Sequence, residues 1–183
     1  YFGQIMSTTF PLESQASLLP LGKDNGYQHL WLRSKAKNGK PLNQLSWFSG
    51  TTFRTLTMMN TPEDEFLFTQ LGANDPEFNL RNDSSFIIRR KNTAATLFVS
   101  AIEFHGRYSP VSEIAINATS SIKNITSTID SAAYTAITIE LTTGKPIQVF
   151  LSNQDSDENQ KHAIEVNGKK INWTGPYLIQ TIK

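Results

Sequence analysis

The stretch HGRYSPVSE, residues 105–113, gathers side chains that could do chemistry in a chain whose other segments are mostly apolar, Thr and Ser. Its ionisable residues are His105, Arg107, Tyr108 and Glu113. A guanidinium pairs with anions, imidazole and phenol groups donate hydrogen bonds, and a carboxylate accepts them. Loops held by a rigid scaffold often carry binding residues, but Gly, Ser and Pro also mark ordinary turns. The segment is therefore either a binding loop or a polar turn.

The element that must position this loop is the apolar run before it, residues 95–104 (ATLFVSAIEF), which predicts a β-strand. Gly106 and Pro110 are then expected to fix a loop that projects the four side chains beyond the sheet. In the alternative interpretation, Arg107 and Glu113 form a local ion pair and His105 caps the strand end. The residues by themselves leave both interpretations open.

Short apolar and β-branched runs with turn residues between them recur along the whole chain, which is typical of an all-β protein. Residues 134–141 (YTAITIEL) alternate most clearly, so one face of that strand should be wet and the other dry. The best helix candidate, residues 63–70, is short. The expected strands are residues 27–34, 51–58, 65–70, 85–91, 95–104, 122–129, 134–141, 147–152, 162–167, 169–173 and 177–182. We predict one all-β domain over residues 1–183, an antiparallel β-sandwich or a two-layer large β-sheet.

Two turns have a recognisable chemistry. Asn167-Gly168 lies between two alternating runs in HAIEVNGKKINW and predicts a two-residue type I′ hairpin, since both residues tolerate positive φ. Thr143-Gly144-Lys145 should close another hairpin.

The composition excludes several classes of function. Seventeen Lys and Arg residues oppose 16 Asp and Glu residues, and the net charge of +1 does not fit a nucleic-acid partner. No apolar run is long enough for a membrane-spanning helix, and no signal-peptide pattern is present, which favours a soluble protein. There is no cysteine, so disulfides and thiolate chemistry are excluded.

The sequence also gives little support for a metal or another cofactor. His29, His105 and His162 lie far apart without paired-ligand spacing. The acidic residues 155–159 (DSDEN) lack the glycine and distal Glu of a calcium loop, so a solvated turn is expected there. We therefore expect no metal site and no cofactor.

Five stretches together carry a resemblance to a known family. They are YFGQIMSTTF (residues 1–10), LGKDNGYQHLWL (21–32), LGANDPEFNLR (71–81), HGRYSPVSE (105–113) and NWTGPY (172–177). Their order along the chain resembles the C-terminal β-sheet domain of oligoalginate lyases, which belong to polysaccharide lyase family seventeen of the heparinase II/III-like superfamily. The resemblance covers nearly all of the chain.

The resemblance implies a larger enzyme in which an N-terminal helical toroid precedes this β domain and the substrate lies between them. It implies β-elimination on alginate oligosaccharides, with an acidic oligosaccharide and the helical domain as partners, a possible homodimer, and a periplasmic or secreted location in a bacterium. The groups that perform this chemistry in the family come from parts that this chain does not contain. We therefore expect no catalytic residue here, and activity of this piece alone stays uncertain.

If the substrate is an acidic polysaccharide, as the resemblance implies, the loop residues that would bind it are His105, Arg107, Tyr108 and Glu113. Arg107 would pair with a uronate carboxylate, and Tyr108 or His105 would donate to sugar hydroxyls. Glu113 would accept from hydroxyls or hold Arg107 in place, because a carboxylate repels a uronate.

Two other functions fit the same residues. A carbohydrate-binding module would use exposed aromatic rings, for which Trp31, Trp47 and Trp173 are the candidates, although strand tryptophans are usually packed in a core. A purely structural β-sandwich would support or dimerise an enzyme. Apolar residues of segment 1–10 are expected to rest against something outside this chain.

Overall fold

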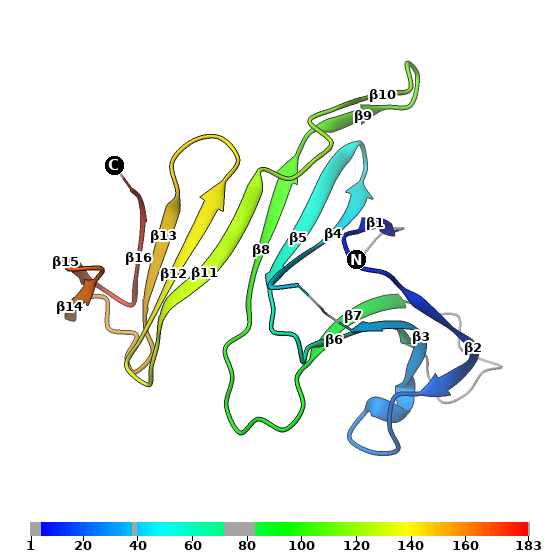
Figure 1. Ribbon diagram of the computed structural model, residues 1–183, viewed down its shortest axis with the longest axis horizontal. Helices are drawn as coiled ribbons and strands as arrows, with labels where there is room; N and C mark the ends of the chain where they lie inside the picture. Colours follow the sequence, from blue (N-terminus) through cyan, green and yellow to red (C-terminus); the bar gives the residue numbers. More distant parts are fainter. Residues whose placement is uncertain (1–4, 38–39, 72–82, 183) are drawn as a thin grey trace. The chain divides into compact units, whose positions relative to one another are not determined.

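The computed structural model describes residues 5–37, 40–71 and 83–182, and the chain divides into two compact units, Tyr1–Ala118 and Thr119–Lys183 (Figure 1). Within the described residues the elements are antiparallel β-strands and one short 3-10 helix, η1 (Tyr27–His29), so the all-β, sandwich-like fold is confirmed. None of this described part forms a helix of the length and hydrophobicity that crossing a membrane requires. The single domain over residues 1–183 stays a prediction.

The first unit contains two four-stranded antiparallel sheets. One has the order β1 (Ile5–Thr8), β4 (Leu42–Ser49), β5 (Thr52–Met59) and β8 (Val99–His105). The other has the order β2 (Glu13–Pro20), β3 (Leu30–Lys37), β6 (Glu65–Leu71) and β7 (Asp83–Arg89). Their shared core includes Leu45, Trp47 and Met58 from the first sheet and Phe66 and Phe68 from the second. Each such buried side chain contributes about 1.5–3 kcal/mol to folding.

Strand β4 shows why the first sheet packs on one face. Its sequence LNQLSWFS alternates, so Leu45 and Trp47 are buried in the core while their neighbours point to the opposite face. Thr55 and Thr57 of the neighbouring strand β5 lie on the face of the first sheet that points away from this core, and they are also buried. Their hydroxyls are hydrogen-bonded there to Ser46 and Gln44, so this face carries a buried polar layer rather than a second apolar core.

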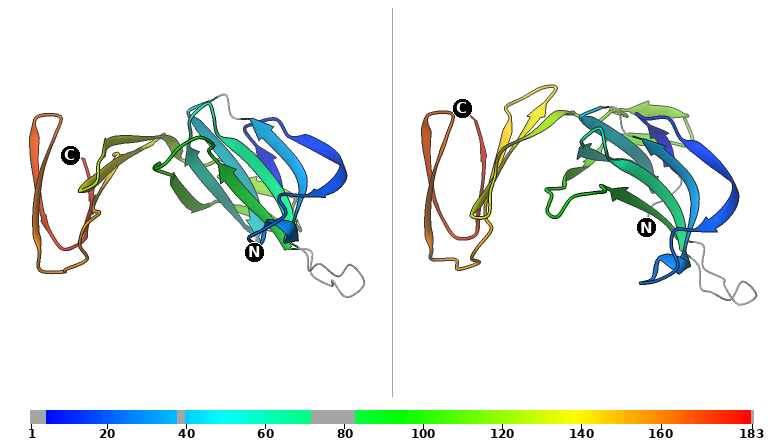
Figure 2. Two further views of the ribbon diagram at one scale, coloured as in Figure 1. Left: turned by 90° about the horizontal axis from the view of Figure 1, so that it is seen from below. Right: turned by 60° about the horizontal axis from the view of Figure 1, so that its bottom comes forward.

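The second unit is a smaller two-layer structure (Figure 2). Its sheet has the order β11 (Ile122–Asp130), β12 (Tyr134–Leu141), β13 (Ile147–Ser152) and β16 (Tyr177–Thr181), and its hairpin consists of β14 (Lys161–Val166) and β15 (Lys169–Thr174). Ala136 and Phe150 of the sheet form a core with Val166 and Trp173 of the hairpin. A last pair of strands, β9 (Arg107–Ser109) and β10 (Ile114–Ile116), belongs to the first unit.

The strands predicted at residues 134–141 and 147–152 have the bounds that the structure shows. Several other predictions were wrong in detail. Residues 95–98 precede β8 without being part of it, and residues 27–29 form η1. The strand predicted at 65–70 is confirmed as β6, which ends one residue later at Leu71, and the short helix candidate at 63–70 is not helical. Phe66, Leu67 and Phe68 are all buried there, because a central strand is covered on both faces. Strands β1, β2, β4, β9 and β10 were not predicted, since their polar or very short sequences give weak signals.

Segment 1–10 is only partly described. Residues 1–4 and the side chains of residues 5 and 6 lie outside the described part, so the apolar contact expected for them is not tested. Phe10 lies in the core of the first unit, with its ring 4.5 Å from that of Phe66.

A buried ion pair joins elements of the first unit. The Asp64 carboxylate has no exposed surface and accepts from Arg90 Nε at 2.7 Å and from Arg90 Nη2 at 2.8 Å. It also accepts from the backbone N–H of Thr61 at 2.9 Å. Burial raises the pKa of Asp64, but these hydrogen bonds and the charge of Arg90 outweigh it, and the pKa lies below its usual value. Arg90 in turn contacts Thr96 and lies 5.1 Å from the ring centre of Phe98, just before β8.

Replacing Asp64 by Asn should lower the free energy of unfolding at neutral pH by about 3–5 kcal/mol, because Arg90 is left as an uncompensated charge. Since the folded pKa of Asp64 is depressed, the wild-type stabilisation is complete above the pKa of the unfolded chain and is lost as the pH falls through the folded value. Urea unfolding from neutral to acidic pH measures both effects. The exposed Asp130→Asn change is the control, and an equal pH dependence in D64N and wild type would contradict the prediction.

The Asn167-Gly168 hairpin is confirmed. Both residues have positive φ, 52° and 75°, and Val166 pairs directly with Lys169. The segment around Gly144, whose φ is 95°, joins β12 to its antiparallel neighbour β13, as expected for a second hairpin.

Replacing Gly168 by Ala should destabilise the protein by about 1–2 kcal/mol, because an L residue is strained in the left-handed region. A Cβ at this position would meet nothing within 4 Å, so the cost is conformational rather than steric. Chemical denaturation measures it, with Lys169→Ala on the adjoining strand as a control. Equal stability of G168A and wild type would show that the turn changes type at no cost.

Candidate functional site

Residues 105–113 lead from the end of β8 into a two-stranded antiparallel ribbon (Figure 1). Arg107 pairs with Ile116, Tyr108 with Ala115 and Ser109 with Ile114, while residues 110–113 form the turn. We call residues 106–117 the β9–β10 arm. The predicted loop is therefore a short hairpin that extends beyond the first sheet.

His105 fastens the base of this arm. Its Nδ1 lies 2.8 Å from the backbone oxygen of Asn117 and its Nε2 lies 2.8 Å from Thr55 Oγ1. A carbonyl only accepts, so in the neutral ring Nδ1 donates to Asn117 and Nε2 accepts from the Thr55 hydroxyl. Thr55 Oγ1 then accepts from Ser46 Oγ, 2.7 Å away. The imidazole also stacks on Phe53 at 5.8 Å between ring centres.

Gly106 allows the two strands of the arm to approach each other. Its φ is +54°, and a Cβ there would lie 2.2 Å from the backbone oxygen of Asn117 and 2.3 Å from that of Ile116. Neither atom belongs to a movable side chain, so only glycine fits.

Tyr108 attaches one side of the arm to the first sheet. Its N–H donates to the backbone oxygen of Thr51 at 2.8 Å, and its ring centre lies 5.6 Å from that of Phe48. Strand alternation places Arg107 and its partner Ile116 on the face opposite to Tyr108. That outward face is partly apolar, since Ile116 is 60% exposed.

The four predicted residues thus differ in what they can do. Arg107 and Glu113 are exposed, and no ion pair joins them to each other or to another residue in the described part of the chain. The expected local ion pair is therefore absent. Tyr108 is half-buried, and His105 uses both ring nitrogens to hold the arm, as the strand-end alternative supposed. Arg107 remains the group best placed to receive an anion.

The tryptophan candidates lie mainly in the cores. Trp47 is 4% exposed and Trp173 is 7% exposed, which confirms the core interpretation for both, and Trp31 is half-buried. His162 stacks on Trp173 at 5.0 Å between ring centres. Among the described residues no group of His, Asp and Glu side chains could hold a metal ion.

One group of polar residues was missed by the sequence analysis. Lys161, Asn172 and Thr174 line a hollow on the β14–β15 hairpin. The signal was present, because a two-residue turn at Asn167-Gly168 pairs residue 161 with 174 and residue 163 with 172.

Comparison with known proteins gives the strongest indication of relationship. The chain is 35% identical over 176 residues to an alginate lyase of Stenotrophomonas maltophilia, covering 96% of this chain and 24% of that protein. It is 32% identical over 180 residues to an exo-oligoalginate lyase of Saccharophagus degradans, again covering 96% of this chain and 24% of the relative. No family model matches the chain.

These relatives confirm the expected similarity to alginate lyases. The chain spans about a quarter of the length of the curated relatives that it matches. The similarity therefore concerns one β-rich part of much longer proteins.

Replacing Thr55 by Val should destabilise the protein by about 1–3 kcal/mol, because His105 Nε2 loses its hydrogen-bond donor while the shape of the side chain is kept. Denaturation measures the change, with Thr52→Val at the start of β5 as the matched control. Two-bond proton–nitrogen NMR spectra should show the proton of neutral His105 on Nδ1 in the wild type. A proton on Nε2 would contradict the hydrogen-bond chain.

Proposed function

We propose that this chain is a β domain of an alginate lyase, in which the β9–β10 arm helps to shape the substrate cleft. The single observation that carries the proposal is the similarity to two alginate lyases over 96% of the chain. The five stretches that resemble polysaccharide lyase family seventeen support its place as the C-terminal β domain of a heparinase II/III-like enzyme.

The substrate of such an enzyme is an acidic oligosaccharide, so a cation and hydroxyl-binding groups are needed. Arg107 supplies an exposed guanidinium without an ion-pair partner among the described residues. We assign it to a uronate carboxylate. Tyr108 lies on the opposite face of the same strand, beside Phe48, and we assign its phenol as a donor to a sugar hydroxyl on that side of the arm.

His105 and Glu113 have different parts in this proposal. Since both nitrogens of His105 are engaged inside the protein, it acts on substrate chiefly by positioning the arm. Glu113 lies in the turn with a φ of 55°, and its carboxylate would accept from sugar hydroxyls at the tip.

The reaction of the complete enzyme would be β-elimination. A neutralised uronate carboxylate makes the C5 proton acidic, a base removes that proton, and an acid protonates the departing O4. We assign none of these catalytic roles to this chain. They belong to a helical domain and an earlier part of the β domain. This chain would assemble with both in the periplasm or outside the cell, and the complete enzyme would form a homodimer.

Replacing Arg107 by Ala in the full-length enzyme should raise KM for alginate oligosaccharides by about tenfold to a hundredfold, because one charge-assisted hydrogen-bonded pair contributes about 1.5–3 kcal/mol. The turnover number should change little, since Arg107 does not touch the reacting atoms. The ultraviolet absorbance of the unsaturated product follows the reaction. Arg33→Ala removes the same charge from an exposed site on β3 and is the control; equal kinetics of R107A and R33A would remove the arm from the substrate site.

A further inference from the structure

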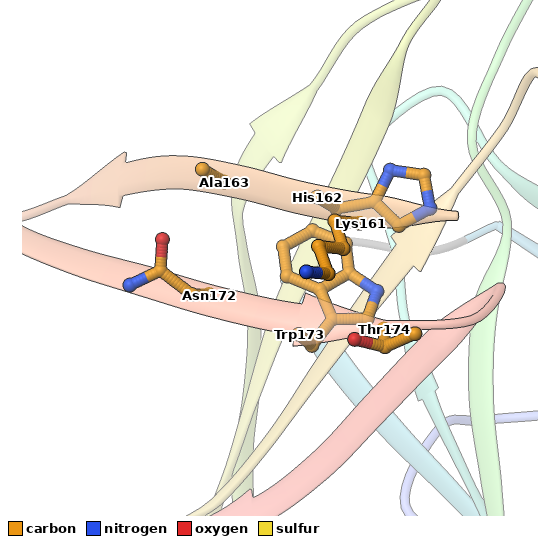
Figure 3. Close-up of a pocket in the computed structure, with 6 residues that line it drawn as sticks. All are labelled: Lys161, His162, Ala163, Asn172, Trp173 and Thr174. Atoms are coloured by element: carbon orange, nitrogen blue, oxygen red, sulfur yellow. The ribbon is translucent and has the colours of Figure 1, made fainter. Parts of the chain in front are cut away.

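The β14–β15 hairpin carries a hollow that the proposed function does not use (Figure 3). Its volume is about 330 Å³, and it is lined by Lys161, His162, Ala163, Asn172, Trp173 and Thr174. Small-molecule sites commonly measure about 300–1,000 Å³. A second hollow of about 340 Å³ adjoins it through the shared residue Thr174 and is lined by Glu158, Thr174, Gly175, Pro176 and Tyr177.

The hairpin register explains the shape of the first hollow. Lys161 lies directly opposite Thr174, and Ala163 lies directly opposite Asn172, so these four side chains share one face. Ala163 is small and leaves space beside the Asn172 amide. A cation, an amide and a hydroxyl therefore lie together on one face of a two-stranded ribbon.

The polar groups of this face are available to a ligand. Lys161, Asn172 and Thr174 are exposed, and their side chains make no hydrogen bond or ion pair with another residue of the described chain. Tyr177, in the adjoining hollow, is 59% exposed.

The opposite face of the hairpin holds these groups in place. Trp173 is buried there, with its ring centre 5.0 Å from that of His162, 5.7 Å from that of Tyr134 and 6.1 Å from that of Phe150. The end of the hairpin is closed by a hydrogen bond from Gly175 N–H to the Gln160 oxygen at 2.9 Å. The backbone that carries these side chains therefore needs little ordering when a ligand binds.

We propose that the two hollows form a binding site for an acidic oligosaccharide, made of residues other than those of the β9–β10 arm. Lys161 would bind a uronate carboxylate, Asn172 and Thr174 would bind hydroxyls, and the Tyr177 ring would cover an apolar sugar face. The Glu158 carboxylate repels the carboxylates of the ligand but accepts hydrogen bonds from its hydroxyls. The uronate carboxylate would therefore turn toward Lys161. The inference rests on the proposed function only for the choice of uronate as the sugar.

Calorimetric titration of the 183-residue chain with a saturated alginate trisaccharide tests this site. Lys161→Ala should weaken binding by about tenfold or more, as expected when a charge-assisted contact is lost. Tyr177→Ala should weaken it several-fold. Lys145→Ala, which removes the same charge from the exposed β12–β13 connection, should leave binding unchanged, and circular dichroism establishes that each variant is folded.

Three outcomes would overturn the site. They are no binding by the wild-type chain, equal binding by K161A and wild type, and equal affinity for the neutral sugar maltotriose. The Arg107→Ala chain separates the two proposals. If binding is lost in R107A and kept in K161A, the oligosaccharide binds to the arm alone. If binding is kept in R107A and lost in K161A, the hairpin site is supported, whatever the kinetics of the full-length enzyme show.

Discussion

The buried pair between Asp64 and Arg90 is the interaction on which the first unit depends most. Asp64 precedes β6 and Arg90 follows β7, so the pair joins the start of β6 to the end of β7 in the second sheet. Through Thr96 and Phe98, Arg90 also holds the segment that leads into β8 of the first sheet. A charge taken out of water is costly unless it is paired and hydrogen-bonded. Asp64 accepts four hydrogen bonds, two from Arg90, one from the Thr61 N–H and one from the Asn60 amide.

The course of β8 then determines where the arm begins. A two-stranded ribbon is marginal by itself, and this one has exposed isoleucines. Its stability comes from its base, where His105 bonds to Thr55 and to the Asn117 carbonyl and Gly106 lets the strands meet. The result is a short hairpin whose position is fixed at its base by His105 and Gly106.

The two units present polar groups in different ways. In the first unit, an arm carries an exposed cation away from the sheet. In the second, a flat hairpin carries a cation, an amide and a hydroxyl above a buried tryptophan. Both arrangements suit a ligand with carboxylates and hydroxyls, and both occur in a chain that is similar to a quarter of the length of two alginate lyases.

Local chemistry alone determined much of the second unit. Asn167 and Gly168 both accept positive φ, and the turn they form sets every pair of the hairpin, including Lys161 with Thr174. The run YTAITIEL likewise gave the bounds of β12, but the wet and dry faces expected from its alternation were wrong. Thr135 and Ala136 lie on opposite faces and are both buried, and Ala136 belongs to the core of the second unit. The sequence also supplied the likeness to alginate lyases and the exclusion of thiolate chemistry.

Only the tertiary structure decided the rest. The partner of His105 Nε2 is Thr55, 50 residues earlier in the chain, and no local pattern records a hydrogen bond across that separation. The sequence left open an ion pair between Arg107 and Glu113, but the strand register places Arg107 opposite Ile116 and no ion pair joins these two residues, both of which the structure describes. For residues 63–70 the sequence offered a strand at 65–70 and a short helix candidate, and the strand is the one that forms, because both sides of the central strand β6 are covered. Local preferences are worth about 1 kcal/mol or less per residue, and burial of Phe66, Leu67 and Phe68 outweighs them.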